Sequence, residues 1–187
     1  MRLGCVKKTT KYSQRNKEER ISYLRELRRL AQQYGSKNIV YFDESGFTAE
    51  SYRPHGWAPR GEKVYGDVSG NNRKRINLIM AQRGKEWLAP MLFTSACDSI
   101  TVNAWLEHAL LPELTRPSVV VMDNAPFHNK NHIKAVLEAA GHMMLPLPRY
   151  SPDFNPIEQS FATIKKRRQF AKSDDLAASI VGQDYVK

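Results

Sequence analysis

The stretch PSVVVMDNAPFH, residues 117–128, holds the apolar run on which the interpretation of the fold depends. Three valines and a methionine run without interruption into Asp123. A short continuous apolar run is typical of a strand buried on both faces, as in the middle of an α/β sheet. Open α/β sheets bind ligands at the rim where such strands end, which is where Asp123 stands. Alternatively, Asp123 and Asn124 only stabilise a turn through local hydrogen bonds.

A second stretch repeats this pattern. NIVYFD, residues 38–43, is followed by ESG at 44–46. We therefore predict a strand that ends at Asp43 and a turn directly after it. Two strands that each end in an aspartate favour a shared site over two independent turns.

The charge distribution indicates a polyanionic partner. The 187 residues predict one domain with a core of its own, and the formal net charge is +10. The excess lies in residues 1–40 and in the cluster KKRR at 165–168. Basic segments around a neutral body favour nucleic acid as the partner. Solvated helix faces are the alternative.

The cellular setting follows from what the sequence lacks. Cys5 and Cys97 match no zinc or redox spacing, so we expect a reduced, cytoplasmic protein. No apolar run approaches the roughly 18 residues that a membrane span needs. The first residues lack the apolar segment of a signal peptide.

The first half of the chain predicts a helix, a loop and a hairpin. Residues 17–34 predict a helix stopped by Gly35, with an apolar stripe of Ile21, Leu24, Leu27, Leu30 and Tyr34. Residues 48–72, rich in glycine and proline, predict a long ordered loop. The apolar segments 75–81 and 86–93 flank RGK at 83–85 and predict a β-hairpin.

The second half predicts alternating helices and strands. A helix is expected from Thr101 to Pro112, with an apolar face of Val102, Trp105, Leu106, Ala109 and Leu110. The next helix stops at Gly141 and is expected to bury Ile133, Val136, Leu137 and Ala140. Residues 142–145 predict a short strand. The whole order predicts a mixed α/β sheet that begins with an antiparallel meander.

The last helix supplies a third carboxylate. Asn155 and Pro156 stand where an N-cap and a first helical residue belong, so Glu158 fits a capping box. The helix is expected to turn its apolar residues inward and the 165–168 cluster outward. Beside Asp43 and Asp123, a metal role for Glu158 accounts for the pattern better. Three gathered acids repel one another unless cations neutralise them, and two divalent ions suit phosphoryl transfer on a nucleic-acid backbone.

Three spaced motifs resemble one known family. YFDESG at 41–46, VMDNAPFH at 121–128 and YSPDFNPIE at 150–158 resemble the catalytic domain of bacterial insertion-sequence transposases, in the mariner-like branch of the DDE superfamily. The 34 residues between Asp123 and Glu158 match the interval that this branch favours. GWAPRG at 56–61 is also similar, and the resemblance covers roughly residues 7–172.

The resemblance implies a fold and a chemistry. The fold would be ribonuclease H-like, with a three-strand antiparallel meander and two parallel strands flanked by helices. Residues 1–16 would form a basic arm or linker and residues 17–187 the endonuclease domain. Asp43, Asp123 and Glu158 would ligate two Mg²⁺ or Mn²⁺ ions. The reaction would be DNA end cleavage followed by 3′-hydroxyl strand transfer.

The resemblance also implies partners and supporting residues. The partners would be double-stranded DNA at the element ends and the target, a second copy of the chain at synapsis, and a separately encoded helix-turn-helix domain. We expect nucleoid association when DNA is bound. DNA contacts are expected from Trp57, Arg60, Lys165 and Arg168. Asn124 and His128 would orient Asp123 or a phosphate, or else stabilise a turn; Asp153 is expected to be structural.

Two other functions fit the same residues. One is a ribonuclease H-type nuclease that cuts RNA–DNA hybrids. The other is a dormant transposase remnant that binds DNA in a salt-sensitive way and no longer cuts it.

Overall fold

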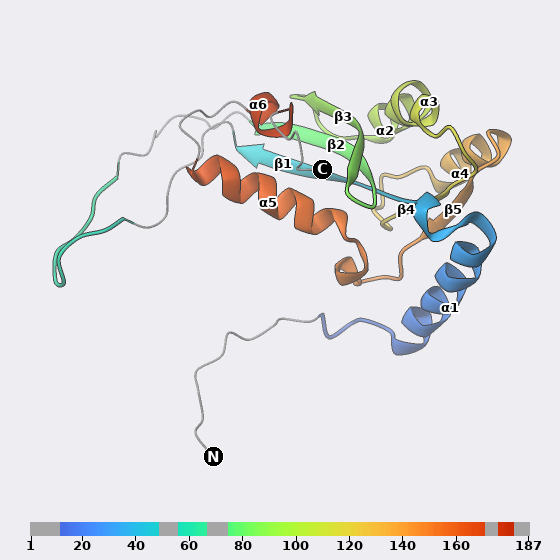
Figure 1. Cartoon of the computed structure of the whole chain (residues 1–187), viewed down its shortest axis with the longest axis horizontal. Helices are drawn as coiled ribbons and strands as arrows, with labels where there is room; N and C mark the ends of the chain where they lie inside the picture. Colours follow the sequence, from blue (N-terminus) through green and yellow to red (C-terminus); the bar gives the residue numbers. More distant parts are fainter. Residues whose placement is uncertain (1–11, 49–55, 67–74, 171–175, 182–187) are drawn as a thin grey trace, which may run out of the picture.

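A five-stranded mixed sheet forms the centre of the computed structural model, which describes residues 12–48, 56–66, 75–170 and 176–181 (Figure 1). The strand order is β3-β2-β1-β4-β5. The first three strands form an antiparallel meander, whereas β4 and β5 run parallel to β1. This confirms the predicted sheet. The strand bounds are β1 Ile39–Thr48, β2 Arg75–Arg83, β3 Glu86–Phe93, β4 Val119–Met122 and β5 Met143–Pro146.

Helices cover both faces of the sheet (Figure 1). On one face lie α2, α4 and the segment after α2, around a core that includes Phe42, Trp105 and Ile133. On the other face α5 and α6 cover β1 and β2, and α1 covers β4 and β5. The helix bounds are α1 Lys17–Tyr34, α2 Ser99–Trp105, α3 Leu111–Glu113, α4 Lys130–Ala139, α5 Ile157–Phe170 and α6 Leu176–Val181. In the described part of the chain, no helix is long and apolar enough to cross a membrane.

The strand β4 confirms the interpretation of the 117–128 stretch. All four of its residues are buried, and Asp123 follows the last of them. The predicted end of β1 is wrong, because the strand continues through Glu44, Ser45 and Gly46 to Thr48. Pairing explains the difference: β2 accompanies β1 as far as Thr48, whereas β4 pairs with it only over residues 39–41. Asp43 therefore lies within a strand, at the point where one neighbour has already ended.

The helix α1 has the predicted bounds, and its predicted apolar stripe is confirmed in part. Asn16 caps it by accepting from two backbone N–H groups. Leu30 is buried and Leu27 and Tyr34 pack beside it, whereas Ile21 and Leu24 are exposed and Tyr23 is buried instead. A distant contact explains the difference, since Tyr23 stacks on Phe154 of the proline-rich connection.

The connection between β5 and α5 is tied to α1. Asp153 accepts two hydrogen bonds from the Arg20 guanidinium, at 2.9 and 2.7 Å, which confirms its structural role. This pairing with Arg20 also lowers the pKa of Asp153. The Arg20 guanidinium lies 3.8 Å from the centre of the Phe154 ring. These contacts of Arg20 tie the connection that precedes α5 to α1.

The remaining helices correct smaller predictions. Asp98 caps α2, so the helix begins before Thr101. The helical backbone continues from α2 through Leu106–Leu110 into α3, so the helix ends at Glu113, one residue after Pro112. Ala140 is exposed just after α4. The hairpin at Gly84, where φ is 61°, and the short strand β5 are confirmed. Much of the predicted 48–72 loop lies outside the described residues, as does most of the 1–16 arm.

Arg168 points inward, contrary to the predicted outward orientation of its cluster. Only 3% of the residue is exposed, and its Nη1 donates to the Thr48 carbonyl oxygen at 2.8 Å. The guanidinium lies beside the Phe47 ring, where helix periodicity brings it round to the apolar face of α5. Lys165, Lys166 and Arg167 are exposed, as predicted.

Arg168 should therefore stabilise the fold. We expect Arg168→Ala to lower the free energy of unfolding by about 1–3 kcal/mol, because it removes a buried charged donor. Lys166→Ala is the matched control: it removes the same charge from the exposed face and should change stability by less than about 0.5 kcal/mol. Urea denaturation measures both. Equal effects of the two substitutions would contradict the buried role.

Candidate active site

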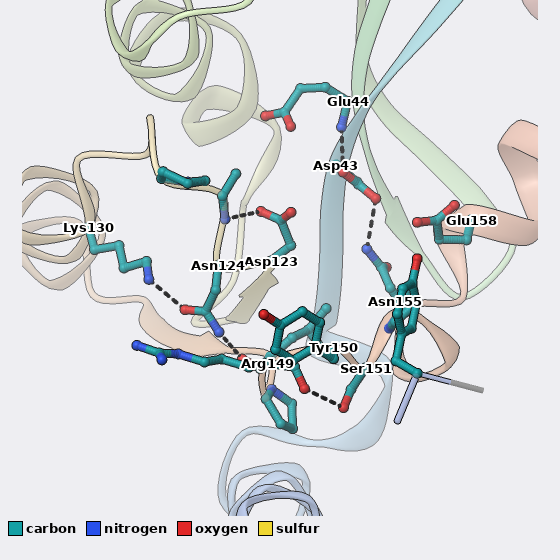
Figure 2. A pocket seen from close by; sticks show the side chains of 16 residues that line it. Asp43, Glu44, Asp123, Asn124, Lys130, Arg149, Tyr150, Ser151, Asn155 and Glu158 are labelled. Atoms are coloured by element: carbon teal, nitrogen blue, oxygen red, sulfur yellow. Dashed lines mark hydrogen bonds between the residues drawn. The ribbon is translucent and has the colours of Figure 1, made fainter. Parts of the chain in front are cut away.

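Three carboxylates from distant parts of the sequence line one cavity of about 800 Å³ (Figure 2). Asp43 comes from the middle of β1, Asp123 from the end of β4 and Glu158 from the first turn of α5. Lys130 and Arg149 also line the cavity. The structure thus brings together the three acidic residues that the sequence predicts as a site.

Asp43 is buried in surroundings that disfavour its negative charge. The residue is only 9% exposed, and both of its oxygens are hydrogen-bonded. Oδ1 accepts from the Glu44 N–H at 2.8 Å and Oδ2 from the Asn155 side chain at 3.1 Å. Burial, and then repulsion by Glu44, Asp123 and Glu158, raises the pKa of Asp43 to about 8. The site therefore disfavours the negative charge that it gathers.

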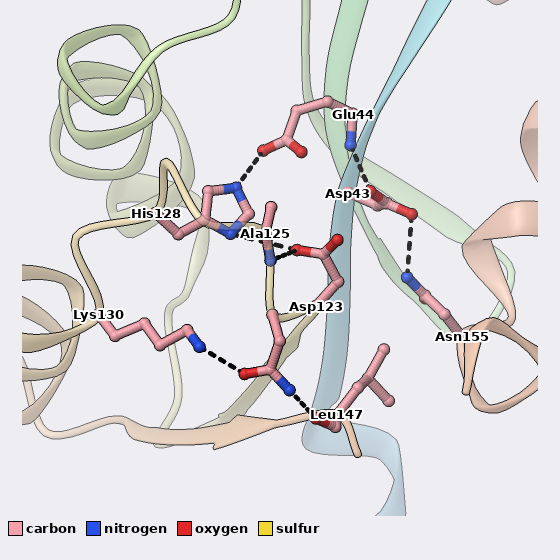
Figure 3. Close-up of polar contacts among 9 residues, drawn as sticks. Asp43, Glu44, Asp123, Ala125, His128, Lys130, Leu147 and Asn155 are labelled. Atoms are coloured by element: carbon pink, nitrogen blue, oxygen red, sulfur yellow. Dashed lines mark hydrogen bonds and ion pairs between the residues drawn. The ribbon is translucent and has the colours of Figure 1, made fainter. Parts of the chain in front are cut away.

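Asp123 has the opposite electrostatic setting (Figure 3). Its Oδ1 accepts from the Ala125 N–H at 3.0 Å and lies 3.2 Å from Nδ1 of His128. Burial acts to raise the pKa of Asp123, but the interactions with His128 and Ala125 outweigh it and lower that pKa. Asp123 is therefore held as a carboxylate.

His128 connects Asp123 to a fourth acid, Glu44. Nε2 of its buried ring lies 3.1 Å from Oε1 of Glu44, while Nδ1 faces Asp123 (Figure 3). Burial acts to lower the pKa of His128, but the two carboxylates raise it to about 9. The two contacts therefore favour the protonated, cationic form of the ring at neutral pH. This geometry fits the predicted orienting role toward Asp123.

Asn124 fits the turn-stabilising alternative. Its Nδ2 donates to the Leu147 carbonyl oxygen, and its Oδ1 accepts from Nζ of Lys130 (Figure 2). These bonds join the loop after β4 to the residue that follows β5 and to the first residue of α4. Asn124 also lines the cavity, so the bonded amide forms part of the wall.

The four residues predicted to contact DNA do not line this cavity. Trp57 and Arg60 are exposed in the described part of their loop. Lys165 is exposed on α5, with Nζ 5.3 Å from the Phe47 ring centre, and Arg168 is buried. DNA contact by Trp57, Arg60 and Lys165 stays a prediction.

Sequence reasoning missed two residues of the site. Glu44 was assigned to a turn, although strand alternation after Asp43 would have placed it on the opposite face of β1. Asn155 was assigned to an N-cap, but its side chain donates to Asp43 and its Oδ1 has no hydrogen-bond partner among the described residues. The capping box that residues 155–158 predict therefore does not form.

The donor set suits a hard divalent cation. Asp43, Asp123 and Glu158 offer carboxylate oxygens, which Mg²⁺ and Mn²⁺ prefer. In the described part of the chain, no three acidic, histidine or cysteine side chains are already close enough together to hold an ion. The repulsion that raises the pKa of Asp43 is what a cation would relieve, so the three residues fit such an ion by chemistry and by shared cavity.

Residues 38–178 match the model of the DDE superfamily endonuclease family. The chain belongs to this family. The matched range includes all three carboxylates. No protein of curated function matches the chain at a significant level.

Solved structures of the Mos1 mariner transposase have a similar fold. Its paired-end complex with Mg matches with a TM-score of 0.74 and 18% identity, over 98% of this chain and 58% of that one. Its paired-end complex with the left transposon end gives 0.71 and 18%, over 97% and 59%. Its catalytic domain alone gives 0.62 and 14%, over 96% of this chain and 85% of that one. The fold is ribonuclease H-like, and the chain spans about 59% of the transposase in the complexes.

The titration of Asp43 and His128 should make the free energy of unfolding depend on pH. Both folded-state pKa values lie above the ordinary ones, so both contributions are present at low pH and are lost as pH rises. The contribution of Asp43 should be lost between about pH 4 and 8 and that of His128 between about pH 6.5 and 9. Together we expect the EDTA-treated protein to lose on the order of several kcal/mol of unfolding free energy across this range. Asp43→Asn should make this loss smaller. Urea denaturation across the pH range measures it, and an unchanged slope in the variant would refute the assignment to Asp43.

Proposed function

We propose that this domain is the catalytic domain of a bacterial insertion-sequence transposase of the mariner-like branch. It cleaves DNA at the element ends with Mg²⁺ or Mn²⁺ and joins the freed 3′-hydroxyl to target DNA. One observation carries the proposal: Asp43, Asp123 and Glu158 line a single cavity, with Asp43 buried among other acids.

The charge balance of the cavity supports a cation-dependent reaction. Among the described residues that line the cavity, the four acids Asp43, Glu44, Asp123 and Glu158 outnumber the two basic side chains, those of Lys130 and Arg149. His128 offsets part of this charge from beside Asp123 and Glu44. With Asp43 also ionised, as a metal ligand must be, the carboxylates would repel a DNA phosphate. Divalent cations remove that repulsion and are the usual partners of such carboxylates in phosphoryl transfer.

Each residue of the site has a distinct task in the proposal. Asp43, Asp123 and Glu158 would hold two ions. When bound, the ions supply positive charge that activates the attacking oxygen and stabilises the leaving one. His128 holds Asp123 in its ionised form and is itself anchored by Glu44. Asn155 fixes the second oxygen of Asp43 from the start of α5.

The similar structures support the proposed partners. Mos1 has been solved with a transposon end, in a strand transfer complex, and with Mg or Mn. For this chain we propose the same classes of ligand: duplex DNA at element ends and target, and two divalent ions. A homodimer at synapsis, a separately encoded helix-turn-helix domain and a nucleoid location belong to the same proposal. Residues 1–16 would link the two domains.

The proposal is tested by the loss of one ligand. Glu158→Gln should reduce Mg²⁺-dependent nicking of DNA carrying the element ends by more than about a hundredfold, since even neighbours of metal ligands cost 10–100-fold. The helix-turn-helix domain is supplied in trans. Glu138→Gln on α4 is the matched control, because that glutamate is exposed and, within the described residues, its one ion pair is with Lys134. This variant should retain full activity.

The same assay separates the alternatives. Undiminished nicking by Glu158→Gln contradicts the proposed site. Preferred hydrolysis of RNA–DNA hybrids by the wild-type protein would favour a ribonuclease H-type nuclease. DNA binding with no metal-dependent cleavage of either substrate would favour a dormant remnant.

A further inference from the structure

A second cavity, of about 630 Å³, adjoins the first. Both are lined by Asp43, Glu44 and Asp123, whereas Glu158 lines only the first. The rest of the second wall comes from the far part of β1, the beginning of β2, residues 94–97 and the loop after β4. Among the described residues it has one basic side chain, that of Arg75.

The guanidinium of Arg75 is held in place by its neighbours on the sheet. Its Nε donates to Oδ1 of Asn77 at 3.1 Å. Asn77 is itself buried, and its Nδ2 donates to the Ser95 carbonyl oxygen at 2.8 Å. Arg75 and Asn77 are two residues apart on β2 and so share one face. Arg75 is therefore held by Asn77, whose side chain is itself buried and hydrogen-bonded.

Gly46 provides the space for this arrangement. It lies opposite Asn77 in the β1–β2 pairing. A Cβ at position 46 would lie 2.2 Å from Nε of Arg75 and 2.3 Å from its Nη2. A larger side chain at position 46 would therefore displace the guanidinium from this place beside β1.

The charge of Arg75 is left for a ligand. Its Nη groups make no hydrogen bond or ion pair within the described residues, where its one bond uses Nε. Arg83, at the other end of β2, differs, because its guanidinium donates to Glu86 at 2.8 and 3.0 Å. A planar, always charged fork beside an open cavity suits a phosphate, which it can bind with two parallel N–H bonds.

We propose that Arg75 binds a phosphodiester group of a DNA strand in this second cavity, directly beside the metal-binding carboxylates. The inference rests on the proposed function and names a substrate-binding residue for it. Arg75 compensates the negative charge that Asp43, Glu44 and Asp123 present to the strand. Gly46 and Asn77 are positioning residues, because they act on the phosphate through Arg75. The strand comes from either the element end or the target DNA.

Binding is measured first, because it needs no cleavage. Fluorescence anisotropy with a nicked DNA duplex, in Mg²⁺ and from 50 to 200 mM salt, gives the affinity and its salt dependence. Arg75→Ala should lower affinity about tenfold, the size of a charge-assisted contact. It should also reduce the slope of log K against log salt by about 0.9, the loss of one phosphate. Arg83→Ala, the matched control, should change neither quantity.

A substitution at Gly46 tests whether the position of the Arg75 guanidinium matters when its charge is kept. Gly46→Ala keeps every charge but displaces the flexible end of Arg75, so it should weaken binding in the same direction as Arg75→Ala. The double variant should bind no more weakly than Arg75→Ala alone, because both changes remove one contact. Unfolding curves check that each variant is folded. Additive losses, or effects of Arg75→Ala equal to those of Arg83→Ala, overturn the proposal, as does a wild-type protein that does not bind the duplex.

The activity arms identify the strand. If Arg75 holds the element end, Arg75→Ala raises KM for hydrolytic nicking of that end. If Arg75 holds the target, nicking is unchanged and transfer of a pre-nicked end into target DNA falls. Either result supports the phosphate site, whereas no effect on nicking and transfer overturns it. Failure of the proposed function would appear separately, as undiminished nicking by Glu158→Gln.

Discussion

The site depends on unequal pairing along the two sides of β1. β2 accompanies β1 as far as Thr48, but β4 leaves it after Tyr41. On the side where β4 has ended, Asp43 has no strand neighbour, and Asp123 turns away from the sheet at the same level. The start of α5 lies beside this opening, where Asn155 donates to Asp43 and Glu158 lines the same cavity. The position of three distant carboxylates thus follows from one early strand end.

The electrostatic cost of this arrangement is unevenly distributed. Burial and repulsion disfavour the charge of Asp43, whereas His128 and a backbone N–H favour that of Asp123. Glu44 and Asp123 together keep His128 charged in a buried position. One buried cation therefore offsets part of the negative charge, and the remainder is what divalent ions and a basic side chain such as Arg75 can neutralise.

The sequence predicts the architecture better than the details of the site. The buried run of valines, the hairpin and the helical periodicity have strong local signals, so the sheet, the hairpin and the bounds of α1 are confirmed. Errors arise where distant contacts decide. The length of β1 depends on β2, the inward turn of Arg168 on β1, and the side chain of Asn155 on Asp43. The pairings of Glu44 with His128 and of Arg75 with Gly46 join segments that no local pattern connects.

The central claim is that Asp43, Asp123 and Glu158 form one divalent-cation site. The most direct measurement is anomalous diffraction from crystals of this domain soaked with Mn²⁺. The account predicts anomalous density in the 800 Å³ cavity, in contact with oxygens of all three carboxylates, and its loss in crystals of Asp123→Asn. Density confined to other parts of the surface, or density in the cavity that persists unchanged in Asp123→Asn, would contradict it.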